Sequence, residues 1–309
     1  MSRIEEALKR ARETTAAGPA AAPPADVFRD PWEVSNAIAP AAEDAAPGGP
    51  GRRSPEGEGA GPAEARQAEG GPAGMALFQG FNPSVIEKIV ATPDIRPVFV
   101  EQYRKLAGIL HHAQLERSLK VVMVTSAMAG EGKTLTATNL ALTFSESYRR
   151  SVLLIDADLR RPTLHETFQV PNLSGLGDSL RAEAEQKLSL VQVSPRLTLL
   201  TAGRPDPDPM SGLTSDRMQR LFDEAASRFD WVIVDTPPIG LLPDARILAQ
   251  MADSTLLVVR AAKTPYALVQ RAVATLGRER ILGVVLNRTE EGLDGSYSYY
   301  TYYDGYGKK

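Results

Sequence analysis

The sequence predicts one α/β domain with a doubly wound, mostly parallel sheet, preceded by a disordered N-terminal linker. Two observations support this prediction. Between about residues 91 and 290, short apolar runs alternate with stretches of helical spacing, as in right-handed strand-helix-strand units. The first apolar run leads into a glycine-rich loop that ends in Lys133-Thr134, and a helical stretch follows it.

Two segments precede this domain. Residues 1–13 have apolar side chains at helical spacing, which predicts a short helix that either frays or docks on a partner. Residues 14–90 are expected to be a linker, because residues 14–76 contain 18 Ala, 10 Gly and 10 Pro and have little apolar surface to bury. The large aromatic residues of that stretch, Phe28 and Trp32, are either a short binding motif or without function.

Within residues 91–290 we expect a helix over 100–115, followed by a series of strands and helices. Apolar runs predict strands at 120–125, 151–155, 197–201, 231–234, 254–259 and 281–286. Helical spacing predicts helices at 133–148, 214–228, 243–251 and 265–279. The apolar runs do not alternate with polar residues, which indicates that helices cover both faces of the sheet.

Composition excludes several classes of protein. The chain has no cysteine, which excludes a disulfide scaffold and any cysteine-based zinc or redox site. The net charge of −3 argues against a nucleic-acid binder. No signal peptide or membrane-spanning run is present. We therefore expect a cytoplasmic protein that reaches the inner face of the membrane only through a partner.

The loop Ser126-Ala-Met-Ala-Gly-Glu-Gly-Lys-Thr134 lies between a predicted strand and a predicted helix, as a phosphate-binding loop does. Its glycines let backbone N–H groups converge on phosphate oxygens at the N-terminus of the helix. Lys133 is expected to reach the β- and γ-phosphates, and the Thr134 hydroxyl to bind Mg²⁺. Ala127 replaces the usual first glycine of such a loop. The alternative is a glycine-rich turn without a ligand.

Three carboxylates stand at the ends of predicted strands. Asp156 and Asp158 follow the second strand, and Asp235 follows the fourth. Ligands of open parallel sheets bind beyond the carboxyl ends of the strands, so we expect these residues beside the loop. Taken singly, each is equally well explained as an aspartate that caps a strand end. Arg160 and Arg161 are expected to pair with these carboxylates or with phosphate, or to form a solvated face.

The C-terminal residues 291–309 are expected to be a flexible tail. Six of the nine tyrosines of the chain lie in it: Tyr297, Tyr299, Tyr300, Tyr302, Tyr303 and Tyr306. Their neighbours are small or polar, so no core is available for six rings. The tail is either a low-complexity segment or a set of phosphorylation sites served by the nucleotide site.

These motifs together resemble those of the bacterial tyrosine autokinases of capsule and exopolysaccharide synthesis. The resemblance rests on Gly130-Glu-Gly-Lys-Thr134, Leu154-Ile-Asp-Ala-Asp-Leu-Arg-Arg-Pro162, Val232-Ile-Val-Asp-Thr-Pro-Pro238 and the tyrosine-rich tail. It implies a P-loop domain of the MinD/ParA-like type that uses ATP and Mg²⁺. The opening residues are also similar to cytosolic members of exosortase-type loci.

The resemblance also implies roles for single residues. The nucleotide contacts would be Ala129, Gly130, Glu131, Gly132, Lys133, Thr134, Leu135 and Asn287. The catalytic residues would be Lys133, Asp156, Asp158 and Asp235. The residues at the metal would be Thr134, Asp158 and Asp235. A tyrosine hydroxyl near pKa 10 must lose its proton to react at neutral pH, and Asp156 is preferred to Asp158 as the base. The family's oligomerisation motif is represented by Glu101 and Arg104, but Ala107 stands in place of its second arginine.

The implied function is ATP-dependent autophosphorylation of the tail between protomers of a homo-oligomer, regulating exopolysaccharide synthesis or export. The implied partners are a membrane polysaccharide co-polymerase that activates the kinase and a cognate tyrosine phosphatase. The alternative is a dimerising ATPase of the ParA/MinD type that acts as a positioning switch. Such ATPases carry an extra lysine in the loop, where this chain has Met128. A non-enzymatic scaffold that nucleotide stabilises is the third possibility.

Overall fold

The computed structural model describes residues 32, 78, 80–92, 95–183, 187–240 and 242–289 of the chain. The predicted N-terminal helix, most of the predicted linker and the tyrosine-rich tail lie outside the described residues. Within the described ranges, no helix is both long and apolar enough to cross a membrane.

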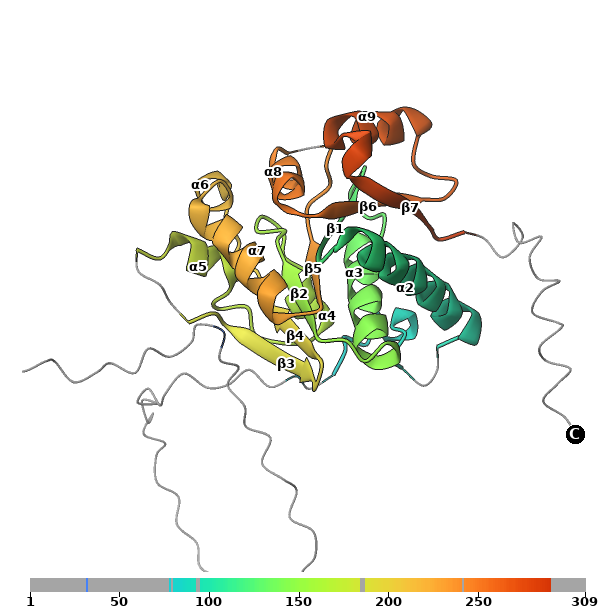
Figure 1. Cartoon of the computed structure of the whole chain (residues 1–309), viewed down its shortest axis with the longest axis horizontal. Coiled ribbons are helices and arrows are strands. Elements are labelled where there is room, and N and C mark those ends of the chain that lie inside the picture. Colours follow the sequence, from blue (N-terminus) through green and yellow to red (C-terminus); the bar gives the residue numbers. More distant parts are fainter. Residues whose placement is uncertain are drawn as a thin grey trace, which may run out of the picture.

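Seven strands form one sheet in the order β3-β4-β2-β5-β1-β6-β7 (Figure 1). Neighbouring strands are parallel except for the antiparallel pair β3 and β4. The strands are β1 Val121–Ser126, β2 Val152–Asp156, β3 Leu190–Ser194, β4 Leu197–Leu200, β5 Trp231–Asp235, β6 Ser254–Arg260 and β7 Ile281–Asn287. The predicted doubly wound, mostly parallel sheet is confirmed.

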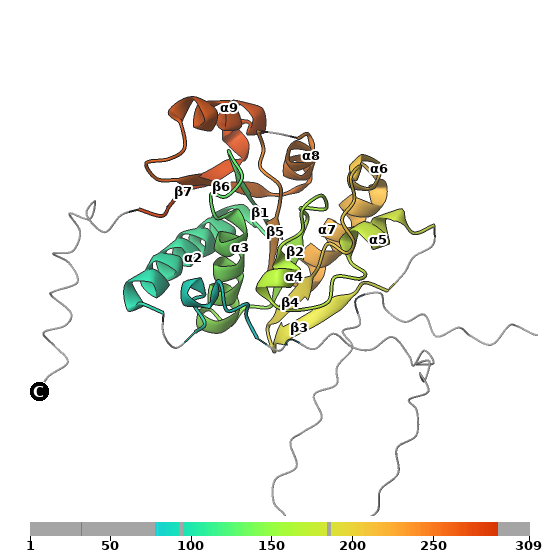
Figure 2. The same cartoon turned by 180° about the vertical axis from the view of Figure 1, so that it is seen from behind.

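Helices cover both faces of the sheet, as the two opposite views show (Figures 1 and 2). The long helices are α2 Pro97–Arg117, α3 Lys133–Leu142, α7 Asp216–Arg228, α8 Asp244–Met251 and α9 Tyr266–Leu276. A π-helical segment, η3 Thr143–Ser147, extends α3. Short elements are α4 Leu164–Thr167, α5 Leu176–Arg181, α6 Met210–Leu213 and the 3₁₀ segments η2 Ile86–Lys88 and η4 Arg278–Arg280.

Each face of the sheet has its own apolar layer. Helices α2 and α3 pack on one face, where the fully buried Trp231 of β5 stacks on Phe144 with ring centroids 4.3 Å apart. Helices α7, α8 and α9 pack on the other face. Helix α7 shows how local sequence produces this arrangement. The Ser215 hydroxyl accepts the N–H of Met218 as an N-cap, and Leu221 and Ala225 lie on the buried side one turn apart.

Three features differ from the sequence expectations. Strand β3 was not expected, because it is a half-buried edge strand that carries no continuous apolar run. Strand β7 was expected to be covered on both faces, which is wrong: Val284 and Leu286 are each 55% exposed at the other edge of the sheet. The linker was expected to reach residue 90, but Ile89 is fully buried and the Asn82 N–H donates to the Thr167 carbonyl. The domain therefore begins earlier than the composition suggested.

Strand order decides which strand ends lie together. Strand β5 lies between β2 and β1, and Asp156 at the end of β2 is in register with Asp235 at the end of β5. Strand β1, which leads into the glycine-rich loop, pairs with β5 on its other side. The loop and both strand ends therefore meet at the carboxyl edge of the sheet.

Candidate active site

The glycine-rich loop is built from backbone conformations that favour glycine. Gly130 and Gly132 have φ angles of +79° and +96°. A Cβ on Gly132 would lie 2.1 Å from Asn287 Nδ2, so glycine is required there by close approach as well. Ala127 is not among the described residues with positive φ, so the alanine at this position is accommodated without backbone strain.

Glu131 holds the loop in place from inside the protein. Its side chain is buried, and its Oε2 accepts the Met128 N–H at 2.6 Å across the loop. Its Oε1 accepts the Arg260 N–H, at the end of β6, at 3.3 Å and also accepts the Thr264 hydroxyl, which lies just beyond that strand. Because the carboxylate is used internally, the backbone of Glu131, and not its charge, is available to a phosphate. No local sequence pattern indicates this bracing role.

Asn287, expected at the nucleotide, lies beside the loop at the end of β7. Its Nδ2 donates to the Glu131 carbonyl at 2.8 Å, and its Oδ1 accepts the Arg288 N–H at 2.9 Å. The side chain therefore braces the loop through its backbone, in addition to the Glu131 carboxylate. Its neighbour Arg288 has a φ of +56°, so the chain turns sharply as it leaves the sheet at this rim.

Lys133 and the carboxylates expected to be catalytic converge at the N-terminus of α3. Lys133 Nζ lies 3.1 Å from Asp158 Oδ2 and 3.8 Å from Asp235 Oδ1. The Thr134 hydroxyl donates to Asp235 Oδ2 at 2.7 Å. Burial lowers the pKa of the Lys133 amine, but the charges of Asp235 and Asp158 outweigh it, so that its pKa is raised and the amine stays charged.

Asp156 is fully buried at the base of this cluster. Its Oδ2 accepts the N–H groups of Thr163 and Leu164 at 3.1 and 3.0 Å, and its Oδ1 accepts the Asp158 N–H at 3.2 Å. Burial raises the pKa of the Asp156 carboxyl to about 8, and the charge of Asp235 adds to this. Burial likewise raises the pKa of Asp235, against the opposite effects of Lys133 and Thr134. The two neighbouring carboxyls therefore share a site in which a proton or a cation is favoured.

The oxygens around Thr134 fit a magnesium ion that comes with a nucleotide. Asp235 Oδ1 is buried, and none of the described residues donates a hydrogen bond to it. Among the described residues, no group of three or more His, Asp or Glu is arranged to hold a metal by itself. Mg²⁺ is usually held by one or two carboxylates together with phosphate oxygens, which matches a site with one free carboxylate oxygen and a threonine hydroxyl.

Two further residues, Thr163 and Asp244, were not assigned a role from the sequence. Thr163 Oγ1 lies 3.2 Å from Thr134 Oγ1. The only sequence feature that points to Thr163 is its position shortly after Asp156 and Asp158. Asp244 is buried and pairs with Arg160, whose Nε lies 2.7 Å from Asp244 Oδ2. Arg160 also donates to the Pro207 carbonyl. Arg160 therefore pairs with Asp244 and not with the strand-end carboxylates, and its expected pairing with phosphate stays a prediction.

The helix motif expected to mediate oligomerisation lies on α2. Glu101 and Arg104 form an exposed ion pair of 2.7 Å within the helix. Ala107 is fully buried in the apolar layer of α2 and α3, so an arginine at this position could not reach the surface without repacking. The six tail tyrosines lie outside the described residues, and their relation to the site stays a prediction.

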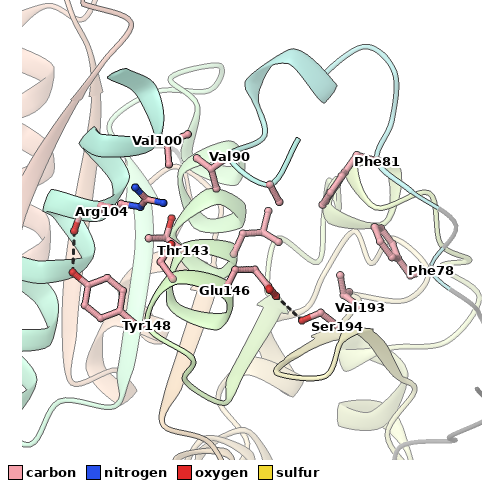
Figure 3. Close-up of a pocket in the computed structure, with 13 residues that line it drawn as sticks. Phe78, Phe81, Val90, Val100, Arg104, Thr143, Glu146, Tyr148, Val193 and Ser194 are labelled. Atoms are coloured by element: carbon pink, nitrogen blue, oxygen red, sulfur yellow. Dashed lines mark hydrogen bonds between the residues drawn. The ribbon is translucent and has the colours of Figure 1, made fainter. Parts of the chain in front are cut away.

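A separate cavity of about 830 Å³ lies at the other end of α3 from Lys133 (Figure 3). Apolar side chains from the segment before α2 and from β3 line it, with polar groups contributed by Arg104 and Glu146. The Glu146 carboxylate accepts the Ser194 hydroxyl at 2.8 Å, and the Tyr148 hydroxyl donates to the Arg104 carbonyl at 3.1 Å (Figure 3). Because the helix separates this cavity from the loop, it is not part of the phosphate site.

Comparisons with known proteins agree with this geometry. A family model described as the CobQ/CobB/MinD/ParA nucleotide binding domain matches residues 122–299. The chain is 37% identical over 240 residues to the tyrosine-protein kinase YwqD of Bacillus subtilis, covering 76% of this chain and 100% of that protein. It is 32% identical over 194 residues to the tyrosine-protein kinase CpsD of Streptococcus agalactiae, covering 62% of this chain and 82% of that protein. Among solved structures, the kinase domain of the Escherichia coli tyrosine kinase ETK superimposes with a TM-score of 0.57 at 32% identity, over 64% of this chain and 80% of that one.

Proposed function

The chain belongs to the bacterial tyrosine-protein kinases, and on this premise we propose that it is an ATP-dependent tyrosine autokinase that phosphorylates its own C-terminal tyrosine cluster. The observation that supports this most is the convergence of Lys133, Thr134 and three aspartates at the start of α3. A cation, a hydroxyl and carboxylates at a helix N-terminus are the groups that phosphoryl transfer requires. We propose regulation of exopolysaccharide synthesis or export as the process that this kinase serves.

The residues of the chain have separable tasks in this reaction. When bound, ATP would supply the γ-phosphoryl group, and Mg²⁺ would neutralise part of the charge of the phosphates. The loop N–H groups and Lys133 hold the phosphate oxygens, so Lys133 must leave Asp158 for the nucleotide. The proposed magnesium ligands are the Thr134 hydroxyl, Asp158 and Asp235. Asp235 Oδ1 accepts no hydrogen bond from a described residue and lies 3.8 Å from the Lys133 amine. Glu131 and Asn287 keep the loop in its receptive shape.

We propose Asp156 as the base that takes the proton from the tyrosine hydroxyl as its oxygen bonds to the γ-phosphorus and the bond to ADP breaks. A base is most effective when its pKa lies near the working pH, and the pKa of Asp156 is raised to about 8. Asp156 is fully buried and its oxygens accept the N–H groups of Asp158, Thr163 and Leu164, so the phenol reaches it only after a local rearrangement. Asp158, which faces Lys133, is the competing candidate.

Matched variants separate the two aspartates. If Asp156 is the base, Asp156→Asn abolishes single-turnover transfer while Mg-ATP still binds, and Asp158→Asn mainly weakens Mg²⁺-dependent binding. The wild-type rate then rises with pH as Asp156 loses its proton, and Asp158→Asn keeps that rise. Transfer by Asp156→Asn at the wild-type rate assigns the base to another group.

We propose that transfer occurs between protomers. Asn287 ends β7 at the rim of the loop, and the tail follows it after a sharp turn at Arg288. An extended chain spans roughly 33–36 Å per ten residues, so the tail is long enough to reach a neighbouring site. Glycines at positions 292 and 295 would equally permit a fold back to its own site. The choice of the trans route rests on the resemblance to the autokinases.

A mixing experiment tests both the activity and the route. A size-tagged Lys133→Met chain with an intact tail is mixed with an active chain whose six tail tyrosines are Phe, in the presence of Mg-ATP. Phosphotyrosine on the tagged chain supports transfer in trans. Labelling of the wild type at a rate independent of concentration, with none on the tagged chain, contradicts it. Label mapped mainly to Tyr103, Tyr148 or Tyr266 contradicts the tail assignment, and ATP hydrolysis without any phosphotyrosine would favour the ParA/MinD-type switch.

The remaining proposals concern partners and location. We propose that the protein acts at the inner face of the membrane through the cytosolic end of a polysaccharide co-polymerase, forms homo-oligomers, and is dephosphorylated by a cognate tyrosine phosphatase. Purified protein with Mg-ATP, assayed for phosphotyrosine with and without that cytosolic end, tests the activator. An equal rate in both samples contradicts activation.

A further inference from the structure

Trp32 is the one residue before position 78 that the structure describes, and it is buried to 6% exposure. It stands in an Ala-, Gly- and Pro-rich stretch, yet it belongs to the apolar layer that α7 shares with the sheet. A large aromatic side chain buried in this way has the character of an anchor.

Trp32 makes three kinds of contact: a hydrogen bond from its N–H, a cation–π contact with its ring and an aromatic contact. Its Nε1 donates to Glu224 Oε2 at 2.6 Å. The guanidinium carbon of Arg228 lies 5.7 Å from the ring centroid, and the Phe229 ring lies 6.3 Å away at an angle of 59°. An acceptor for the N–H, a cation over the π face and an aromatic wall are the complementary partners of tryptophan.

We propose that Glu224, Arg228 and Phe229 form a docking site for the N-terminal arm of this same chain, with Trp32 as its anchor residue. We call these three residues the indole site. It selects an indole, because a phenylalanine has no N–H for Glu224 and an alanine has no ring for Arg228 and Phe229. The occupant is the segment around Trp32, in which Arg29 and Asp30 precede Pro31.

The position of the indole site separates it from phosphoryl transfer. Phe229 lies two residues before the start of β5, whereas Asp235 lies at the other end of that strand, in the active site. The next described residue after Trp32, Phe78, packs against Phe81 and Phe168 in the apolar layer of α2 and α3. Trp32 and Phe78 thus lie in the two opposite apolar layers of the sheet.

Such an anchor is releasable. Closing the long loop of residues 33–77 has an entropic cost that the contacts of a single indole must offset. The indole site is thus a releasable attachment point for Trp32, and it is separate from the nucleotide site.

Tryptophan fluorescence of the full chain tests the docking. The chain has two tryptophans, so Trp231→Phe leaves Trp32 as the only indole. We expect blue-shifted emission that acrylamide quenches poorly, and a several-fold rise in quenching when Phe229→Ala or Glu224→Gln is added. Asp223→Asn is the matched control, since it removes one charge from the same helix and Asp223 bonds to Gln219 instead.

The test has clear opposing outcomes. Emission and quenching of Trp32 like those of free tryptophan, in a chain whose circular dichroism is native, overturn the proposal. If Trp231→Phe does not fold, the difference between wild-type and Trp32→Phe emission reports the same property. Shielding that disappears on dilution would place Trp32 on a second copy and overturn docking within one chain. Binding of Mg-ATP by Trp32→Ala is expected to equal that of the wild type.

Discussion

The Thr134 hydroxyl donates a 2.7 Å hydrogen bond to Asp235 Oδ2, which joins the first turn of α3 to the carboxyl end of β5. Both residues are proposed magnesium ligands, and they are already in contact. Asp235 Oδ1 remains without a donor from any described residue, so one oxygen is available to a cation without breaking this bond. The metal site is therefore largely preorganised by the fold.

Lys133→Met is expected to lower tyrosine phosphorylation by on the order of a hundredfold or more, because it removes the amine placed for the phosphate oxygens. Circular dichroism should remain native, with the thermal midpoint lowered by a few degrees, since Asp158 and Asp235 lose their cation. Lys263→Met, at an exposed position, is the control. An anti-phosphotyrosine blot that shows full activity in Lys133→Met would contradict the loop assignment.

Asp235→Asn is expected to weaken Mg²⁺-dependent ATP binding by about tenfold, which corresponds to roughly 1.4 kcal/mol. The amide keeps the shape and one oxygen for Thr134, but it loses the charge that binds the cation. Nucleotide binding titrated against Mg²⁺ measures the effect, with Asp223→Asn as the control. A Mg²⁺ dependence identical to the wild type would transfer the metal role to Asp156 or Asp158.

Asp156→Asn is expected to make the free energy of unfolding of the ligand-free protein less dependent on pH. The folded protein holds a proton on Asp156 up to about pH 8, whereas the unfolded chain loses it near pH 4. Between these values the folded state binds more protons, so the free energy of unfolding falls as pH rises. The neutral amide removes this dependence, so between pH 5 and pH 8 the free energy of unfolding should fall by at least about 1 kcal/mol less in Asp156→Asn than in the wild type.

Urea unfolding at pH 5 and pH 8 measures this effect. The wild type should lose more stability than Asp156→Asn between the two values, and Asp223→Asn should behave like the wild type. Equal losses in wild type and Asp156→Asn would mean that Asp156 is ionised in the folded protein.

Glu131→Gln is expected to weaken ATP binding by about tenfold while the fold stays intact. Glu131 accepts hydrogen bonds from Met128, Arg260 and Thr264, and a glutamine amide would present a donor to one of these donors. The loop would lose its brace, although no charge that contacts phosphate is removed. Calorimetric titration with ATP measures the change, and Glu87→Gln at an exposed position is the control. Wild-type affinity in Glu131→Gln would show that the loop holds its shape without the carboxylate.

The strands and long helices could be predicted because their signals are local. The apolar run of β1, the loop after it and the helical spacing of α3 lie within one stretch of sequence, and each was found where it was expected. Edge strand β3 and the four-residue helices α4 and α6 were missed, because short or half-buried elements leave little periodicity to detect. The pairing of Arg160 with Asp244 was missed because it joins residues far apart in the chain.

By itself, the sequence determined the fold class, the phosphate loop and the set of acidic residues, because strand and helix formation and the loop motif depend on neighbouring residues. Only the tertiary structure decided which strand ends are adjacent. The position of β5 between β2 and β1 brings Asp156 and Asp235 together, and their burial there raises both pKa values. The same is true of Trp32, whose burial depends on Glu224, Arg228 and Phe229, nearly two hundred residues away. Burial and charge proximity arise from contacts across the chain, and no local pattern encodes them.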